Sequence, residues 1–316
     1  MKVYLTIDVE CYSGDYDAEV YGEGLGLPFI LDSCKRHGLS ATFFVESLGA
    51  TQWGGAGVRR ICRDLNDNQQ DIQLHLHPSV AMIDGIKDCR DVFRDLEVGM
   101  QEHLLRIGRD ILRDSGVSKV VAFRAGDLAA DAATLIAMDR VGIRLGSNRD
   151  LDGKCSIRSK LNHVFPVVND VSILNGQMDL PVTAMRSMFP FIDGRHRHFE
   201  ISALGAAEMK DGIRKLQQAG YATVTILTHP GEFFRKVGGR YIPVRKNCRR
   251  WEVLLEFLSR ESGLVVQCVG DMANERANSG RQTSPSIPLF NPLYSLARIV
   301  EQAKHRVWAK AAGVRP

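Results

Sequence analysis

Two pairs of side chains with metal-binding chemistry each follow a short apolar run. Asp8 and Glu10 end the first such run, close to the amino terminus. His75 and His77 end another, at 71–76. Residues two apart on a β-strand point to the same side, so each pair would share one face. Neighbouring carboxylates need a compensating cation or arginine, and imidazole is a common zinc ligand. Two histidines and one carboxylate form a catalytic zinc set that leaves one position open for water.

Two further polar residues end other apolar runs. Arg124 follows the run at 119–123, and His229 follows the run at 223–227. An arginine there could pair with Asp8, hold it ionised and orient it. His229 is a candidate general acid because the pKa of histidine lies near working pH. Each residue alone also fits a simpler interpretation, such as a solvated acidic loop, a surface ion pair or a hydrogen-bonded loop histidine. Together they favour a hydrolytic metal site.

Short apolar runs alternate with amphipathic stretches through most of the chain. The sequence predicts strands at 3–7, 41–45, 71–76, 119–123, 142–145, 223–227 and 264–267. It predicts helices at 27–37, 58–65, 88–113, 131–141, 202–219 and 246–260. This alternation indicates parallel strand–helix–strand units, whose functional residues gather at the carboxyl ends of the strands. The pattern alone does not separate a barrel from an open doubly wound sheet.

Composition is that of an ordinary globular protein. Of the 316 residues, 44% are hydrophobic and 25% are charged, and the net charge of +4 requires no nucleic acid partner. The seven cysteines form no C-x-x-C pair, so neither a zinc ribbon nor a disulfide framework is indicated. The first residues do not have the pattern of a signal peptide, and no run approaches the ~18 apolar residues of a spanning helix. We therefore expect a cytoplasmic protein that does not bind nucleic acid.

The motifs occur in an order that is typical of the polysaccharide deacetylase family. They are Thr-Ile-Asp-Val-Glu at 6–10, Ala-Thr-Phe-Phe-Val at 41–45, His-Leu-His-Pro at 75–78, Phe-Arg-Ala-Gly at 123–126 and Leu-Thr-His-Pro at 227–230. The chain resembles this family over roughly residues 1–270. The resemblance implies an α/β fold, a distorted, incomplete β/α barrel of about seven strands. It also implies hydrolysis of N-acyl groups, mostly on amino sugars, with a bound divalent metal.

The same resemblance implies roles for individual residues. Asp8 corresponds to the catalytic base, and Arg124 corresponds to the arginine that anchors it. Glu10 corresponds to the carboxylate ligand of the metal and His75 to the first histidine ligand. His229 corresponds to the catalytic acid. The implied cofactor is one divalent metal, for which we expect zinc, with cobalt or nickel as the alternatives.

The sequence departs from the family pattern at two places. The commonest pattern has adjacent aspartates, whereas here one residue separates the first carboxylate from Glu10. The second histidine ligand usually lies four residues after the first, but that position is Ser79, so we expect His77 to be the second ligand. An aspartate that would tune the catalytic acid is not evident, and Asp150 and Asp179 are the candidates.

A second, shorter resemblance concerns the substrate. Leu-Gly-Ser-Asn-Arg-Asp at 145–150 and Leu-Pro-Val-Thr at 180–183 are similar to lipid-linked formamido-sugar deformylases. This implies an amino sugar with an acetyl or formyl group, carried by a nucleotide or a lipid as a cell-envelope precursor in the cytoplasm or at the membrane face. Two other functions stay open: a catalytically silent glycan-binding protein on the same barrel, and a metal-free amidohydrolase of a small cyclic amide. The candidate acid, base and metal ligands favour the metal-dependent hydrolase.

Four further residues are candidates for substrate binding. Asp127 follows the Phe-Arg-Ala-Gly motif, and Trp53 lies in a glycine-rich segment where its ring could stack on a sugar. His196 and His198 belong to an Arg-His-Arg-His cluster, expected in an irregular loop, that could contact a phosphate or a sugar acid. A solvated basic loop explains the same cluster without any ligand.

The end of the chain differs in character from the rest. We assign residues 1–271 to the barrel, 272–290 to a linker and 291–316 to a basic amphipathic helix. From Arg281 onward, six basic residues stand against Glu301 alone. Such a helix can lie on an anionic membrane as a peripheral contact. Its apolar face can equally pack on the barrel or on a partner subunit.

Overall fold

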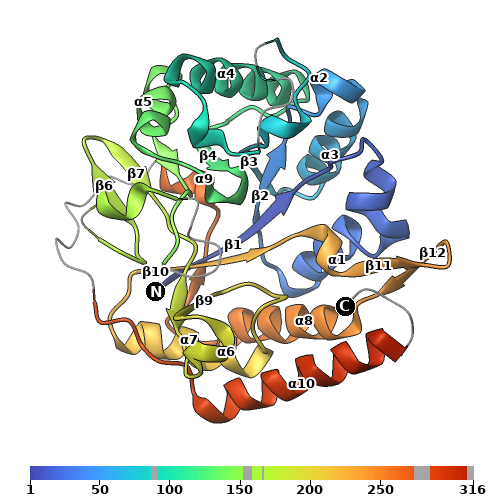
Figure 1. Ribbon diagram of the computed structural model, residues 1–316, viewed down its shortest axis with the longest axis vertical. Helices are drawn as coiled ribbons and strands as arrows, with labels where there is room; N and C mark the ends of the chain where they lie inside the picture. The colour runs from blue at the N-terminus through green and yellow to red at the C-terminus, as the bar shows by residue number, and fades with distance from the viewer. Residues whose placement is uncertain (85, 87–90, 152–158, 166, 274–284, 312–316) are drawn as a thin grey trace.

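The computed structural model describes the whole chain except residues 85, 87–90, 152–158, 166, 274–284 and 312–316, and the side chains of 193 and 305–311. Most of the predicted linker and the end of the predicted carboxyl-terminal helix therefore lie outside the described residues. The remainder is a curled β-sheet surrounded by helices (Figure 1).

One mainly parallel sheet forms the centre of the molecule. Its strands are β1 (Lys2–Val9), β2 (Thr42–Glu46), β3 (Asp71–Leu76), β4 (Ala122–Ala125), β5 (Leu145–Gly146), β6 (Ser172–Leu174), β7 (Gln177–Asp179), β10 (Thr223–Thr228) and β13 (Val265–Val266). The hydrogen-bonded order is β10-β1-β2-β3-β4-β5-β7-β6, with β13 also paired to β1. Only the β6–β7 pair is antiparallel in this described sheet. The expected α/β fold with an incomplete barrel is confirmed.

The strands are buried on both faces, and alternate residues meet two different apolar layers. Leu5 and Phe43 belong to the large core that the sheet shares with the helices. Tyr4 and Phe44 belong to a second, smaller cluster. Because side chains alternate along a strand, Tyr4 has the same orientation as Asp8, and the functional residues continue this second face.

Amphipathic helices cover the outside of the curl (Figure 1). They are α1 (Leu27–His37), α3 (Ala56–Asp67), α4 (Val98–Asp114), α5 (Ala132–Arg140), α7 (Ala206–Gln218) and α8 (Arg245–Arg260), with the short helices α2 (Ala50–Trp53), α6 (Pro190–Asp193) and α9 (Val269–Met272). In α1, Leu27, Ile30 and Cys34 are buried at helical spacing. The helix ends at Gly38, whose φ of 63° suits a residue without a Cβ atom.

Helix α4 begins later than the periodicity predicts. The apolar spacing indicates a helix over 88–113, but the helix spans Val98–Asp114. Phe93 is buried before it, with its ring centroid 5.1 Å from that of Phe123. Asp91 lies in the same segment and contacts His77. Tertiary contacts of these two side chains therefore override the helical period in this stretch.

An irregular segment spans the open side of the barrel between β7 and β10. Leu180 donates its backbone N–H to the carbonyl oxygen of Gly146 at 2.8 Å, and Thr183 donates to the carbonyl oxygen of Thr225 at 3.1 Å. These single bonds take the place of a strand ladder. The barrel is thus incomplete between β7 and β10.

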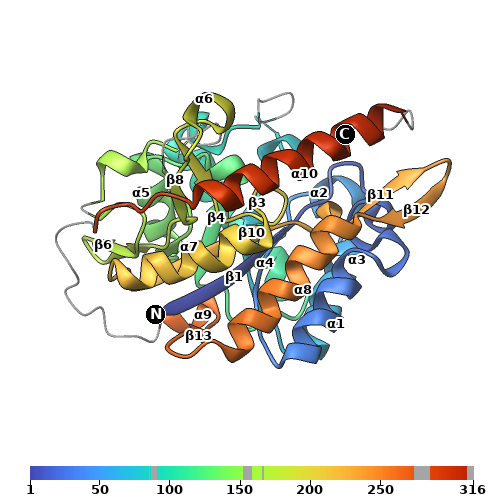
Figure 2. The same ribbon diagram turned by 90° about the horizontal axis from the view of Figure 1, so that it is seen from below.

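Two antiparallel hairpins lie outside the main sheet: β8 (Ala184–Arg186) with β9 (His196–His198), and β11 (Phe234–Val237) with β12 (Arg240–Pro243). The expectation of an irregular loop for the Arg-His-Arg-His cluster is wrong, because the cluster pairs with β8 as a strand. The β11–β12 hairpin projects from the edge of the molecule (Figures 1 and 2).

Helix α10 (Pro292–Ala311) lies across α7 and α8 and docks through polar contacts (Figure 2). Arg298 donates to Glu208 at 2.8 Å, and both side chains are fully buried. Leu293 and Leu296 are 72% and 52% exposed, so apolar residues of this helix face outward. Among the described residues, no helix is both long enough and apolar enough to span a membrane.

Candidate active site

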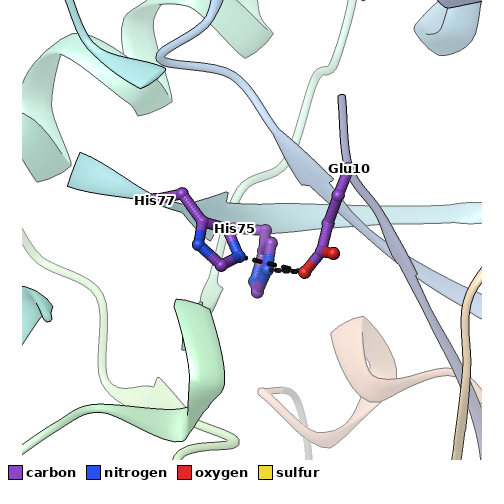
Figure 3. Close-up of side chains that lie close together, drawn as sticks. All are labelled: Glu10, His75 and His77. Atoms are coloured by element: carbon purple, nitrogen blue, oxygen red, sulfur yellow. Dashed lines mark hydrogen bonds and ion pairs between the residues drawn. The ribbon is translucent and has the colours of Figure 1, made fainter. Parts of the chain in front are cut away.

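Three potential metal ligands meet at the carboxyl edge of the sheet (Figure 3). Glu10 follows β1, His75 lies on β3, and His77 follows β3. The Nε2 atoms of His75 and His77 lie 2.9 and 3.0 Å from the same oxygen, Oε1 of Glu10. In a tetrahedral zinc site with bonds of about 2.0–2.1 Å, ligand atoms lie roughly 3.3 Å apart. If the three ligand atoms move apart by a few tenths of an ångström, they can therefore bind one divalent ion.

Hydrogen bonds behind both imidazoles orient them toward this point. Nδ1 of His75 contacts the carbonyl oxygen of Arg124 at 2.9 Å, and Nδ1 of His77 contacts Oδ2 of Asp91 at 2.5 Å. A protonated Nδ1 leaves the Nε2 lone pair for a metal, as in many histidine sites. Burial lowers the pKa of His77, but its hydrogen bonds to Asp91 and Glu10 outweigh this and raise the pKa to about 10. This negative environment favours a cation.

Asp8 and Arg124 form a buried ion pair beside the three ligands. Nη1 of Arg124 donates to Oδ1 of Asp8 at 2.6 Å, and the guanidinium is fully buried. The remaining donors reach Ser147 Oγ at 2.8 Å and Thr6 Oγ1 at 3.1 Å, and the guanidinium lies over the ring of Phe44. The pairing expected from the sequence is present, and one carboxylate oxygen of Asp8 stays outside it.

His229 follows β10, which pairs with β1 on the side away from β2, β3 and β4. Its Nε2 atom is 4.0 Å from Oε1 of Glu10, and groups of Asp8, Glu10 and His229 come within 4.8 Å of one another. Nδ1 is 3.3 Å from Oε1 of Glu232. Burial lowers the pKa of His229, but the hydrogen bond and charge of Glu232 outweigh this and raise the pKa to about 10. The ring is thus held as a proton donor.

Solved structures resemble the chain over most of its length. A putative polysaccharide deacetylase from Mycobacterium smegmatis is similar with a TM-score of 0.57 and 13% sequence identity, over 91% of this chain and 93% of that one. The chain has the polysaccharide deacetylase fold. No protein-family model matches the sequence, and no curated protein does. The fold is therefore recognised from the structure.

The deacetylase fold does not by itself select a reaction. A 4-alpha-glucanotransferase from Thermococcus litoralis is similar with a TM-score of 0.54 and 9% identity, over 91% of this chain and 42% of that one. The two names describe different chemistry on a common architecture. Function must therefore be argued from the side chains at the edge of this deacetylase fold.

The aspartates considered as partners of His229 lie elsewhere. Asp150 pairs with His198 at 2.9 Å, and Asp179 accepts from Arg149 at 2.8 Å. Neither contacts His229, which Glu232 faces instead. Glu232 lies three residues after His229 on a tight turn, so local spacing could have identified it.

Glu232 is itself held by neighbouring donors. Its carboxylate accepts from Thr228 at 2.6 Å and from Ser202 at 3.0 Å. Glu200 lies against it, and burial together with the charge of Glu232 raises the pKa of Glu200 to about 7. A protonated Glu200 can donate to Glu232. This arrangement keeps one negative charge beside His229.

Tyr12 is a further residue that the sequence reasoning missed. Its hydroxyl lies 3.0 Å from Nε2 of His77 and 3.2 Å from Oε2 of Glu10, and the side chain is 48% exposed. Burial of the hydroxyl and the charge of Glu10 raise the pKa of Tyr12 above its usual value, so it stays protonated. It lies two residues after Glu10, which is the same i, i+2 spacing that linked the predicted pairs.

A cleft of about 370 Å³ opens over these groups, within the range of small-ligand sites. It is lined by Asp8, Glu10, Tyr12, Ala18, Glu19, His229, Pro230, Gly231, Phe234, Arg235 and Lys236. The four predicted substrate-binding residues are not among these described lining residues. Trp53 packs over Gly14, Asp127 is exposed after β4, His196 is on β9, and His198 is buried against Asp150. Their contact with substrate stays a prediction.

Proposed function

We propose that this protein is a metal-dependent hydrolase that removes an N-acyl group from an amino-sugar-containing substrate. One observation supports this above all: Glu10, His75 and His77 converge on a single point, and Asp8 and His229 lie beside Glu10. A candidate base and a candidate acid thus adjoin a candidate metal site. The shared fold with a putative polysaccharide deacetylase agrees with this proposal.

The proposed cofactor is one divalent ion, zinc first, with cobalt or nickel as alternatives. Glu10, His75 and His77 would hold it, and their donor types are those of catalytic zinc sites. When bound, such an ion polarises the acyl carbonyl and lowers the pKa of a bound water toward ~7.

Asp8 is the proposed base. Arg124 donates a hydrogen bond to its Oδ1 atom, so Oδ2 is the atom that accepts a proton from the attacking water. Because Arg124 is anchored by Ser147 and Thr6, the carboxylate has a defined orientation. The hydroxyl of Tyr12 can donate to the oxyanion that forms on the acyl carbon.

His229 is the proposed acid. An amine leaves poorly unless it is protonated as the C–N bond breaks, so amide hydrolysis needs a proton donor at the nitrogen. Glu232 faces Nδ1 and favours the imidazolium, which leaves the Nε2 proton for the leaving amine. The acid and base approach the reacting carbon from different strands, β10 and β1.

The proposed substrate is a nucleotide- or lipid-linked amino sugar of the cell envelope, with an acetyl or formyl group. We propose that it is met in the cytoplasm or at the membrane face. The five cysteines in the described part of the chain are free thiols, which supports a reducing compartment.

The metal site and the reaction can be tested together. Elemental mass spectrometry should find about one equivalent of metal in the wild type and little in His77→Ala. The matched control His103→Ala removes a histidine on α4, away from the metal site, and should retain the metal. The metal-loaded wild type should release acetate or formate from N-acylated amino sugars. A protein that stays metal-free after reconstitution, or one with metal but no acyl release, would contradict the proposal.

We also propose a peripheral contact of α10 with an anionic membrane. Leu293 and Leu296 face outward, and Phe191 of α6 is also fully exposed. Liposome flotation should recover the wild type but not Leu293→Glu/Leu296→Glu. Equal recovery of both proteins would remove the membrane contact.

A further inference from the structure

Basic residues are concentrated in the hairpin that borders the cleft and in the helix after it. The stretch 233–251 has seven lysine and arginine residues and no aspartate or glutamate, which leaves 34 basic and 37 acidic residues in the rest of the chain. The stretch comprises β11, β12 and the start of α8. This stretch is therefore one of two strongly basic segments of the chain, with the carboxyl-terminal segment, and its hairpin projects from the barrel (Figures 1 and 2).

Two of these basic residues belong to the wall of the cleft. Arg235 and Lys236 line it together with Asp8, Glu10 and His229. Strand β11 begins two residues after Glu232, so the chain passes from the proposed acid directly into this wall. A molecule that fills the cleft can therefore meet both the carboxylates of the candidate site and two cationic side chains.

The hairpin is anchored through Phe234, and a ring contact holds the side chain of Lys236. Phe234 is buried, and its ring lies against Gly22, where a Cβ atom would be 2.6 Å from the ring and φ is +51°. Tyr241 on β12 meets Phe234 edge to face at 5.7 Å, and the ammonium of Lys236 lies 5.1 Å from the Tyr241 ring. Only glycine suits the position beneath Phe234, and preorganised side chains lose less entropy on binding.

We propose that Arg235 and Lys236 form a binding site for the phosphate of the group that carries the amino sugar. Arginine and lysine recognise phosphate through charge-assisted hydrogen bonds. The proposed function places the acyl group at Asp8 and Glu10, so the phosphate of the carrier would meet Arg235 and Lys236. Glu19 also lines the cleft, and its carboxylate accepts hydrogen bonds from Tyr12 N and Ser13 Oγ.

This inference rests on the proposed function for the acyl end of the substrate, but phosphate binding can be measured without turnover. Calorimetry on the full chain in chelator-treated buffer, with inorganic pyrophosphate or uridine diphosphate, avoids binding through a metal. Arg235→Gln/Lys236→Gln should weaken binding at least tenfold. Lys35→Gln/Arg113→Gln removes the same charge from the ends of α1 and α4, at the opposite edge of the sheet, and should stay within twofold of the wild type.

A second set of ligands distinguishes the two carriers that present phosphate. Flotation with phosphatidylcholine vesicles, with and without phosphatidylglycerol, tests a lipid phosphate. Binding of uridine diphosphate that the hairpin variant loses supports a nucleotide carrier, and phosphatidylglycerol-dependent flotation that it loses supports a lipid carrier. If no phosphate ligand separates the wild type from the hairpin variant, the phosphate site is wrong. The single variant Lys236→Gln should also bind phosphate more weakly while its unfolding midpoint stays unchanged. Weaker binding then cannot be explained by a general loss of fold. Intact phosphate binding without acyl release would instead contradict the proposed function.

Discussion

The candidate active site has two sides, which we call its walls, and they are built differently. On the wall formed by the sheet, the side chain of His75 is 1% exposed and Arg124 is fully buried, and both bond to neighbouring strands. On the other wall, His229 is 29% exposed on a turn, and the basic hairpin follows it. The groups proposed to hold metal and base are thus fixed by the sheet. The groups proposed to meet the leaving amine and the carrier lie on a turn and on the hairpin that follows it, outside the main sheet.

The largest effect should come from the buried wall. Arg124→Met leaves the carboxylate of Asp8 buried without its counter-charge, so we expect a loss of about 3–5 kcal/mol in the free energy of unfolding. Urea denaturation measures this. The control Arg214→Met breaks the exposed pair with Glu261 and should cost under about 1 kcal/mol. Equal losses in the two variants would show that burial does not distinguish the pairs.

Removing the base should abolish most of the activity of the protein that stays folded. Asp8→Asn keeps the shape of the side chain but cannot accept the proton, so we expect turnover to fall about 10²–10⁴-fold. Acyl release by the metal-loaded enzyme measures this, with Asp17→Asn as an exposed control. Near-native turnover with unchanged metal content would remove Asp8 from its role.

A smaller effect should follow from loosening one histidine. Asp91→Asn weakens the hydrogen bond behind His77, so we expect the affinity for zinc to fall about 10–100-fold. Competition with a chromophoric chelator measures the affinity. Asp95→Asn changes another aspartate of the same segment, one that pairs with Arg94, and should leave the affinity unchanged. An unchanged affinity for zinc in Asp91→Asn would show that Asp91 does not contribute to metal binding.

The smallest effect concerns the carboxyl pair behind His229. The pKa of Glu200 is raised from 4.5 to about 7, so the folded state binds its proton more tightly than the unfolded state. Wild-type stability should therefore fall as pH rises between these values, and Glu200→Gln should escape this fall. Denaturation at several pH values should show a stability difference that grows to pH 7 and then levels. The exposed control Glu256→Gln should give a flat difference, and a flat profile for Glu200→Gln would argue against the raised pKa.

The residues that the sheet positions could be predicted from the sequence, because side chains alternate regularly along a strand. Side chains at i and i+2 share a strand face, and parallel strands end at one edge, so the spacing alone places Glu10, His75 and His77 together. The Asp8–Arg124 pair follows from the same reasoning. The order of the motifs then indicates the barrel.

The contacts made by turns and loops could not be predicted in the same way, because they depend on the path of irregular segments. Asp91 falls where the periodicity indicates a helix, and its contact with His77 arises from a loop. The hairpin at Phe234–Pro243 was not predicted, since its residues do not alternate clearly between apolar and polar. The hairpin's basic character is visible in the sequence, but its place on the cleft is not.

Arg124 contacts both the proposed base and a proposed metal ligand, through different atoms. Its guanidinium holds Asp8, and its backbone carbonyl holds His75. Any displacement of β4 therefore carries the base and a metal ligand in the same direction. A movement of β4 should therefore change the distance between the proton acceptor and the metal site only slightly. An incomplete barrel can in this way support chemistry that tolerates little misalignment.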